Sequence, residues 1–309
     1  MDQGTRWRVR SARGGRSRAV LASVAAATVL GVAGCDAVGG DEAAPSGTGA
    51  KKSAPAPSPT PVWDTSPASV AAVGDSITTG FDACSVLADC PEVSWATGGS
   101  EKVDSLAVRL LGPAGAAERS WNYAVTGARM ADLPGQMARA VGRAPELVAV
   151  MAGANDACRA TASAMTPVAD FRADFEDAIR TLRTSLPKTQ VYVASVPDLK
   201  RLWSQGRTSA MGKEVWKLGI CPSMLGDPDA LDAAANERRE TVRGRVEEYN
   251  KALEEVCAAD ERCRYDGGAV YEYRFGTAQL SRWDWFHPSV DGQARLAEIA
   301  HRTVTAAKP

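Results

Sequence analysis

Three side chains in this 309-residue chain have the types that acyl-transfer chemistry needs, although one of them lies far from the other two in the sequence. Ser76 directly follows a predicted buried strand and could serve as a nucleophile. His287 could be its base, and Asp284 lies three residues earlier, within reach of the imidazole Nδ1. The only other histidine, His301, falls opposite the apolar face of a predicted C-terminal helix and is expected to be solvated. A nucleophile, a base and a group that orients the base are what acyl transfer requires.

Each of these residues also has a structural explanation. Gly74-Asp75-Ser76 could be a turn that caps a helix, and Asp284 could cap a turn as well. The nucleophile-elbow pattern Gly-x-Ser-x-Gly is absent from the sequence, which argues against the α/β-hydrolase family. Pro288 restrains the backbone of His287 and can open the following helix, which favours a fixed position for the base.

Two further blocks support the catalytic interpretation. One ends in Gly127 after a predicted strand, and the other is Gly153-Ala-Asn155-Asp156 after the next. In the order Gly-Asp-Ser, Gly, Gly-x-Asn-Asp and Asp-x-x-His, the four blocks resemble the SGNH (GDSL-type) family of esterases and acyl hydrolases. The resemblance spans residues 73–287 and leaves all four blocks intact.

The resemblance implies a Ser76-His287-Asp284 triad that works through an acyl-enzyme. It also implies an oxyanion hole formed by the backbone N–H groups of Ser76 and Gly127 and by the side-chain amide of Asn155. These residue types suit the role, because glycine permits a close approach and an Asn amide donates N–H. The neighbouring aspartates, Asp75 and Asp156, are expected to be structural loop residues.

The function expected from this pattern is that of an extracytoplasmic serine ester hydrolase, an esterase or lipase-like acyl hydrolase. A carbohydrate O-acetylesterase or an acyltransferase of the same family remains an alternative, and a non-catalytic binding lipoprotein is a further one. Proteins of this family act on lipids, simple esters, acetylated sugars and thioesters, and nothing in the sequence selects among these substrates.

The elements that must position these residues follow an α/β pattern. Short apolar runs over residues 69–73, 121–125, 147–151 and 191–196 predict strands, with helical periodicity between them. The clearest helical stripe covers 168–186, and further helices are expected over 237–258 and 289–307. Residues 199–233 read as an irregular, partly helical excursion. The pattern predicts a doubly wound, mostly parallel sheet with helices on both faces, a three-layer α/β/α domain.

Six of the seven cysteines lie in the predicted domain. Two pairs share a Cys-x5-Cys spacing, which suits small disulfide loops and differs from the Cys-x2-Cys spacing of zinc sites. Proximity favours Cys84 with Cys90 and Cys257 with Cys263, which leaves Cys158 with Cys221. Free buried thiols are the alternative. With cysteines assigned to disulfides and only two histidines in the chain, no metal site is expected.

The N-terminus is predicted to be an export signal. Six Arg residues precede an uncharged run over residues 19–34, and Val32-Ala-Gly-Cys35 resembles the lipobox of bacterial lipoproteins. Residues 1–35 are therefore expected to be a lipoprotein signal with Cys35 lipidated, 36–67 a Pro/Ala/Ser-rich tether, and 68–309 the hydrolase domain. The protein would be anchored to a membrane outside the cytoplasm. Secretion after an ordinary cleavage is the alternative.

Composition excludes other classes of function. The net charge of the chain is −1, and its excess of positive charge lies in the predicted signal segment. The rest of the chain is therefore mildly acidic, and nucleic-acid binding is not expected. Neither a Gly-x-Gly-x-x-Gly motif nor a P-loop occurs, so no nucleotide cofactor is expected. We expect a monomer that acts on a small-molecule, lipid or glycan ester.

Four tryptophans are candidate walls of a substrate pocket, although large aromatic side chains are more often core residues. They are Trp203, Trp216, Trp283 and Trp285.

Overall fold

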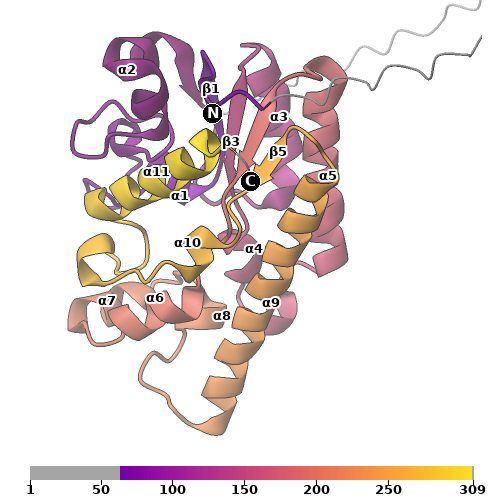
Figure 1. Cartoon of the computed structure of the whole chain (residues 1–309). Helices are drawn as coiled ribbons and strands as arrows, with labels where there is room; N and C mark the ends of the chain where they lie inside the picture. The colour runs from indigo at the N-terminus through magenta and orange to yellow at the C-terminus, as the bar shows by residue number, and fades with distance from the viewer. Residues whose placement is uncertain (1–62, 308–309) are drawn as a thin grey trace, which may run out of the picture. The chain divides into compact units, whose positions relative to one another are not determined.

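The computed structural model describes residues 63–307, which contain a five-stranded sheet with all neighbouring strands parallel (Figure 1). The spatial order is β2-β1-β3-β4-β5. Because the order reverses at β1, the switch point of the sheet lies beside β1, where doubly wound folds bind ligands. The doubly wound fold expected from the sequence is confirmed. The strands are β1 (Val70–Gly74), β2 (Ser120–Asn122), β3 (Leu147–Met151), β4 (Gln190–Val193) and β5 (Cys263–Tyr265).

Helices cover both faces of the sheet. α3, α5 and α9 pack in series on one face, whereas α2 and α11 pack together on the other (Figure 1). The α-helices are α1 (Ser76–Thr79), α2 (Leu106–Arg119), α3 (Leu133–Val141), α4 (Ala154–Ala157), α5 (Val168–Ser185), α6 (Leu199–Gly206), α7 (Ala210–Trp216), α8 (Pro222–Leu225), α9 (Ala233–Ala258), α10 (Ala269–Glu272) and α11 (Val290–Thr305). Short 3₁₀ helices are η1 (Pro91–Val93), η2 (Met130–Asp132), η3 (Ala162–Ala164) and η4 (Thr277–Gln279).

The core explains why the central strands read as unbroken apolar runs. Every residue of β1, β3 and β4 is buried, because helices cover both faces of the sheet. α5 buries the predicted stripe that includes Phe171, Phe175 and Leu182. Phe171 stacks on Tyr249 of α9 with ring centroids 4.1 Å apart, which joins two of the helices that cover this face.

The segment over residues 199–233, expected to be irregular and partly helical, forms the three short helices α6, α7 and α8. Trp203 and Trp216 are buried within it. The Trp203 ring lies 4.1 Å from the guanidinium of Arg239 and 5.0 Å from that of Arg207. These two tryptophans are therefore packing residues of this segment.

The structure contains the three disulfides expected from the sequence, two from proximity and the third by elimination. Cys84–Cys90 closes the loop that follows α1, and Cys257–Cys263 joins the end of α9 to β5. Cys158–Cys221 spans 63 positions of sequence and ties the end of α4 to the start of α8. The last bridge fastens the segment that carries α6 to α8 to the carboxyl edge of the sheet.

The N-terminal part of the described chain already lies against the domain. The Trp63 indole donates a hydrogen bond to the Val304 carbonyl at 2.8 Å, and the Arg264 guanidinium lies 4.3 Å from its ring. The segment expected to be a tether thus includes residues that pack on the domain, so the domain begins no later than Trp63. Cys35 and the predicted signal lie outside the described residues. Among residues 63–307, no helix is long and apolar enough to cross a membrane.

Candidate active site

Ser76 stands at the carboxyl end of β1, on the first residue of α1, next to the switch point of the sheet. The turn that places it there depends on Gly74, whose φ is +148°. A Cβ at Gly74 would lie 2.1 Å from the Met151 carbonyl oxygen, so only glycine lets β1 and β3 approach this closely. Asp75 caps α1 by accepting the Ile77 N–H at 3.0 Å.

His287 and Asp284 complete a hydrogen-bonded series with Ser76. The Nε2 of His287 lies 2.8 Å from the Ser76 Oγ, and its Nδ1 is bonded to the Asp284 Oδ2. Asp284 Oδ1 also accepts the N–H groups of Phe286 and His287, at 2.9 and 3.0 Å. Because Asp284 accepts from Nδ1–H, Nε2 is left as the acceptor for the serine hydroxyl. The structure thus brings together the three residues expected from the sequence.

The electrostatics of the pair suit a base. Burial of His287 disfavours the imidazolium, but the charge and hydrogen bond of Asp284 outweigh burial, so the pKa of His287 is raised. Burial alone would raise the pKa of the Asp284 carboxyl, but the charge of His287 and its hydrogen bonds lower that pKa overall. Asp284 therefore stays ionised and stabilises a protonated His287.

The loop that carries His287 is held by side-chain and backbone hydrogen bonds. The Trp216 indole donates to the Asp284 carbonyl at 2.7 Å, and the Ser281 N–H donates to the His287 carbonyl at 2.7 Å. Trp285 adopts a φ of +53° and packs on α7, where a Cβ at Gly212 would lie 3.0 Å from its ring. Trp285 thus braces the base loop against α7.

The candidate oxyanion donors lie in loops that are bonded to one another. Thr79 Oγ1 of α1 is 3.0 Å from the Thr126 Oγ1, which precedes Gly127. Asn155 donates one amide hydrogen to the Ala128 carbonyl at 3.0 Å, which leaves its second amide hydrogen for a ligand. Within the described chain, the N–H groups of Ser76 and Gly127 have no protein acceptor.

A pocket of about 440 Å³ adjoins Gly127. Its lining mixes small residues of the 125–128 loop with polar side chains of α3 and the turn before it. The residues that line it are Val125, Thr126, Gly127, Ala128, Asp132, Gly135, Gln136 and Arg139.

Three supporting residues have no signal in the sequence. The Gln136 side chain accepts the Gly74 N–H at 2.7 Å and donates to the Gly74 carbonyl at 2.9 Å. The Gln293 side chain accepts the Trp95 N–H and donates to the Ile77 carbonyl, both at 2.9 Å. The Phe81 ring meets the His287 ring edge-on at 5.0 Å. Single glutamines on helices and a lone phenylalanine form no motif, so only the fold shows what they contact.

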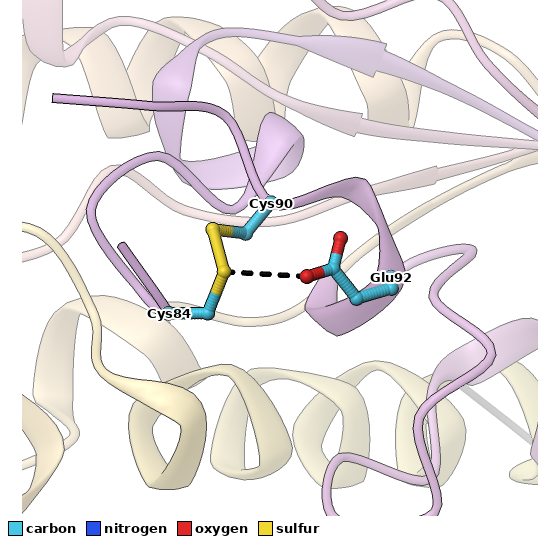
Figure 2. A group of neighbouring side chains, drawn as sticks. All are labelled: Cys84, Cys90 and Glu92. Atoms are coloured by element: carbon cyan, nitrogen blue, oxygen red, sulfur yellow. Dashed lines mark hydrogen bonds between the residues drawn. A yellow bond between two sulfur atoms is a disulfide. The ribbon is translucent and has the colours of Figure 1, made fainter. Parts of the chain in front are cut away.

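Two side-chain groups in the described part of the chain have spacings that could hold a metal ion. In the first, Cys84 and Cys90 are joined as a disulfide beside Glu92, so no thiolate is left to act as a ligand (Figure 2). The second group is Asp82, Asp284 and His287. There the His287 Nδ1 is already bonded to Asp284, so a metal ion would have to displace that hydrogen bond.

The fold and the site define a class: doubly wound α/β proteins with a hydrogen-bonded serine, histidine and aspartate at the carboxyl edge of the sheet. The family follows from the sequence match. The chain belongs to the GDSL-like lipase/acylhydrolase family, whose model matches residues 70–300. The resemblance to the SGNH (GDSL-type) family is thereby confirmed.

Solved structures with a similar fold include three from different proteins. A Parabacteroides merdae protein assigned as a GDSL-like lipase is 18% identical, with 80% of this chain and 100% of that chain covered and a TM-score of 0.44. The extracellular lipase of Streptomyces rimosus is 16% identical over 75% of this chain and 99% of its own, with a TM-score of 0.41. The salicylyl-acyltransferase SsfX3 of a tetracycline biosynthetic pathway is 20% identical over 77% of this chain and 54% of its own, with a TM-score of 0.46. No curated protein matches the chain.

Proposed function

We propose that this protein is a serine ester hydrolase with Ser76 as nucleophile, His287 as general base and Asp284 as the group that orients the base. The observation that carries the proposal is the continuous hydrogen-bonded series from Ser76 through His287 to the buried Asp284. The family of the chain, which comprises lipases and acylhydrolases, supports the same chemistry.

In the proposed reaction, the Ser76 Oγ attacks the ester carbonyl carbon while its proton passes to the His287 Nε2. The carbonyl oxygen becomes an oxyanion, which accepts the N–H groups of Ser76 and Gly127 and the free amide hydrogen of Asn155. The imidazolium then gives its proton to the departing alcohol, and an acyl-serine remains. Water attacks the acyl-serine with His287 again as base, which releases the acid and restores the serine.

Hydrolysis of p-nitrophenyl acetate by the purified protein tests the proposal. We expect Ser76→Ala and His287→Ala each to lower kcat/KM by about 10³-fold or more while the folded state persists. His301→Ala is the matched control, because it removes the only other histidine and lies on α11 away from Ser76. Activity of Ser76→Ala at the level of the wild type would refute the proposal.

The substrate can be identified by varying the ester. A screen over acyl chain lengths and acetylated glycans would identify the acid and alcohol parts that the site accepts. If adding an alcohol or glycan acceptor diverts the acyl group from water to that acceptor, the protein is an acyltransferase that uses the same serine.

We also propose that the protein is a monomeric lipoprotein held outside the cytoplasm by a lipid on Cys35. The export-type N-terminus supports this location, as do three disulfides in the described domain, because disulfides persist in oxidising compartments. Metabolic labelling with a fatty-acid analogue should mark the wild type and not Cys35→Ser. Equal labelling of both would show that Cys35 is not the anchor.

A further inference from the structure

Asp82 is a buried carboxyl group that the proposed reaction leaves without a role. It lies in the segment after α1, two residues before the Cys84–Cys90 disulfide loop, and the residue is 1% exposed. Its Oδ1 accepts the Leu87 N–H, and its carbonyl accepts the Ser281 hydroxyl at 2.6 Å. Its Oδ2 is buried without a hydrogen-bond partner among residues 63–307, which is costly for a carboxyl group with a purely structural role.

The carboxyl group of Asp82 lies beside the base. Single ligand atoms of Asp82, Asp284 and His287 all lie within 4.8 Å of one another. The charged groups that act on His287 come from three places: Asp284 on its own loop, Asp82 in the segment after α1 and Asp75 in the turn before α1. Phe81, the neighbour of Asp82, contacts the imidazole edge-on, so two consecutive residues of the segment after α1 adjoin the base.

We propose that Asp82 is a positioning residue of this site, a second carboxylate that acts on the Asp284–His287 pair and favours the imidazolium formed when Ser76 loses its proton. The inference rests on the proposed function and adds a group that the four sequence blocks do not contain. An opposite charge within about 4–6 Å stabilises the charged form of a titrating group. The disulfide and the Ser281 bond hold Asp82 at that distance.

The charge of Asp82 depends on pH. Burial, together with the charge of Asp284, raises the pKa of Asp82 to about 6. Above that pH the ionised Asp82 raises the pKa of His287. Below it the carboxyl is neutral and has an O–H that can donate to Asp284. Removal of the Asp82 charge should therefore lower the pKa of His287.

The two-histidine composition makes the test direct. In protein labelled with ¹⁵N-histidine and carrying a tag without histidine, the NMR spectrum reports only His287 and His301. We expect Asp82→Asn to lower the titration midpoint of His287 by about one pH unit and to leave His301 unchanged. The acidic limb of kcat/KM for p-nitrophenyl acetate should move to lower pH by the same amount.

Asp89→Asn is the matched control. Asp89 lies in the same segment after α1 and accepts hydrogen bonds from Thr79 and Thr126, so its loss disturbs the segment without removing a charge that acts on His287. Asp82 has a φ of +55°, which Asn and Gly also adopt, and Asp82→Gly replaces Asp82→Asn if the latter does not fold. An unchanged His287 midpoint, or an equal shift in Asp89→Asn, would overturn the role of Asp82.

This titration needs no turnover, so its failure is separable from failure of the proposed function. If the titration midpoint of His287 is unchanged in Asp82→Asn while the ester is still hydrolysed through Ser76, only the role of Asp82 is refuted. If Ser76→Ala still hydrolyses the ester, the proposed function is refuted, whatever the titration shows.

Discussion

Ser76 and His287 meet at one hydrogen bond, but different forces hold the two residues in place. Ser76 follows a strand that is paired on both sides, with β2 and with β3, so the backbone ladder of the sheet sets its position. His287 lies in the loop over residues 280–288, which has only a few backbone hydrogen bonds of its own and is held further by side-chain bonds from Asp284 and Trp216. The proposed nucleophile, on a strand end, is thus placed by topology, whereas the position of the proposed base also depends on particular side chains.

This difference predicts that the two sides fail in different ways. Changes on the base side should remove activity while the domain stays folded, because few backbone bonds depend on that loop. Changes to the backbone on the nucleophile side should destabilise the domain, because they act on the centre of the sheet.

The largest effect is expected from Asp284→Asn on the base side. The Asn oxygen can still accept backbone N–H groups, but its neutral amide neither stabilises the imidazolium nor selects the Nδ1–H tautomer. We expect kcat/KM to fall by about 10³- to 10⁴-fold, with a loss of unfolding free energy of only about 1 kcal/mol. Ester hydrolysis and denaturant unfolding measure the two quantities.

The control for that change is Asp291→Asn, on the first turn of α11, where the carboxylate is about half-exposed. It should leave both kcat/KM and the unfolding free energy near those of the wild type, because Asn can still accept the Gln279 hydrogen bond and the ion pair with Arg295 is solvent-exposed. A fall of less than tenfold in Asp284→Asn would show that Asp284 is a turn cap and does not orient the base.

The same contrast explains what the sequence could and could not predict. The strand that leads into Ser76 is an apolar run buried on both faces, and the Gly-Asp-Ser turn at its end marks the carboxyl edge of the sheet. β5 was not predicted, because it is only three residues long, and its middle residue, Arg264, is a buried cation that breaks any apolar pattern. Its place depends on pairing with β4, which is a long-range contact.

The site shows a similar limit. Ser76, His287 and Asp284 were found because their order and spacing match a chemical requirement, and the structure places them in one hydrogen-bonded series. Asp82 and Gln136 were not found, because each acts through a distance that only the folded chain sets. Proximity in sequence predicted two disulfides directly, and the third followed by elimination.

The next effect concerns the backbone on the nucleophile side. In Gly74→Ala the new Cβ would meet the Met151 carbonyl oxygen at 2.1 Å, and the φ of +148° is strained for any residue with a Cβ. We expect the unfolding free energy to fall by about 3 kcal/mol or more, measured by denaturant unfolding.

Gly127→Ala separates backbone strain from the clash. Its φ is +84°, but nothing lies within 4 Å of the added Cβ. The cost should therefore be limited to about 1 kcal/mol of backbone strain. Equal losses in the two variants would mean that the close approach of β1 to β3 does not require glycine.

The last effect is expected at Asp75, and its size depends on pH. Asp75 is fully buried, and its Oδ2 has no partner among the residues that the structure describes. Burial raises its pKa to about 7, so the stability of the protonated form is complete below about pH 4 and is lost as the pH rises through 7. Asp75→Asn keeps the cap of α1 and cannot ionise.

We therefore expect Asp75→Asn to unfold less readily than the wild type at pH 8, by about 1–2 kcal/mol, and to match it near pH 4. Denaturant unfolding at the two pH values measures this difference. A variant that is less stable than the wild type at pH 8 would mean that the ionised carboxylate is accommodated in the turn before Ser76. The nucleophile side would then carry a stabilising charge, and the two sides of the site would be held by more similar forces than the backbone alone indicates.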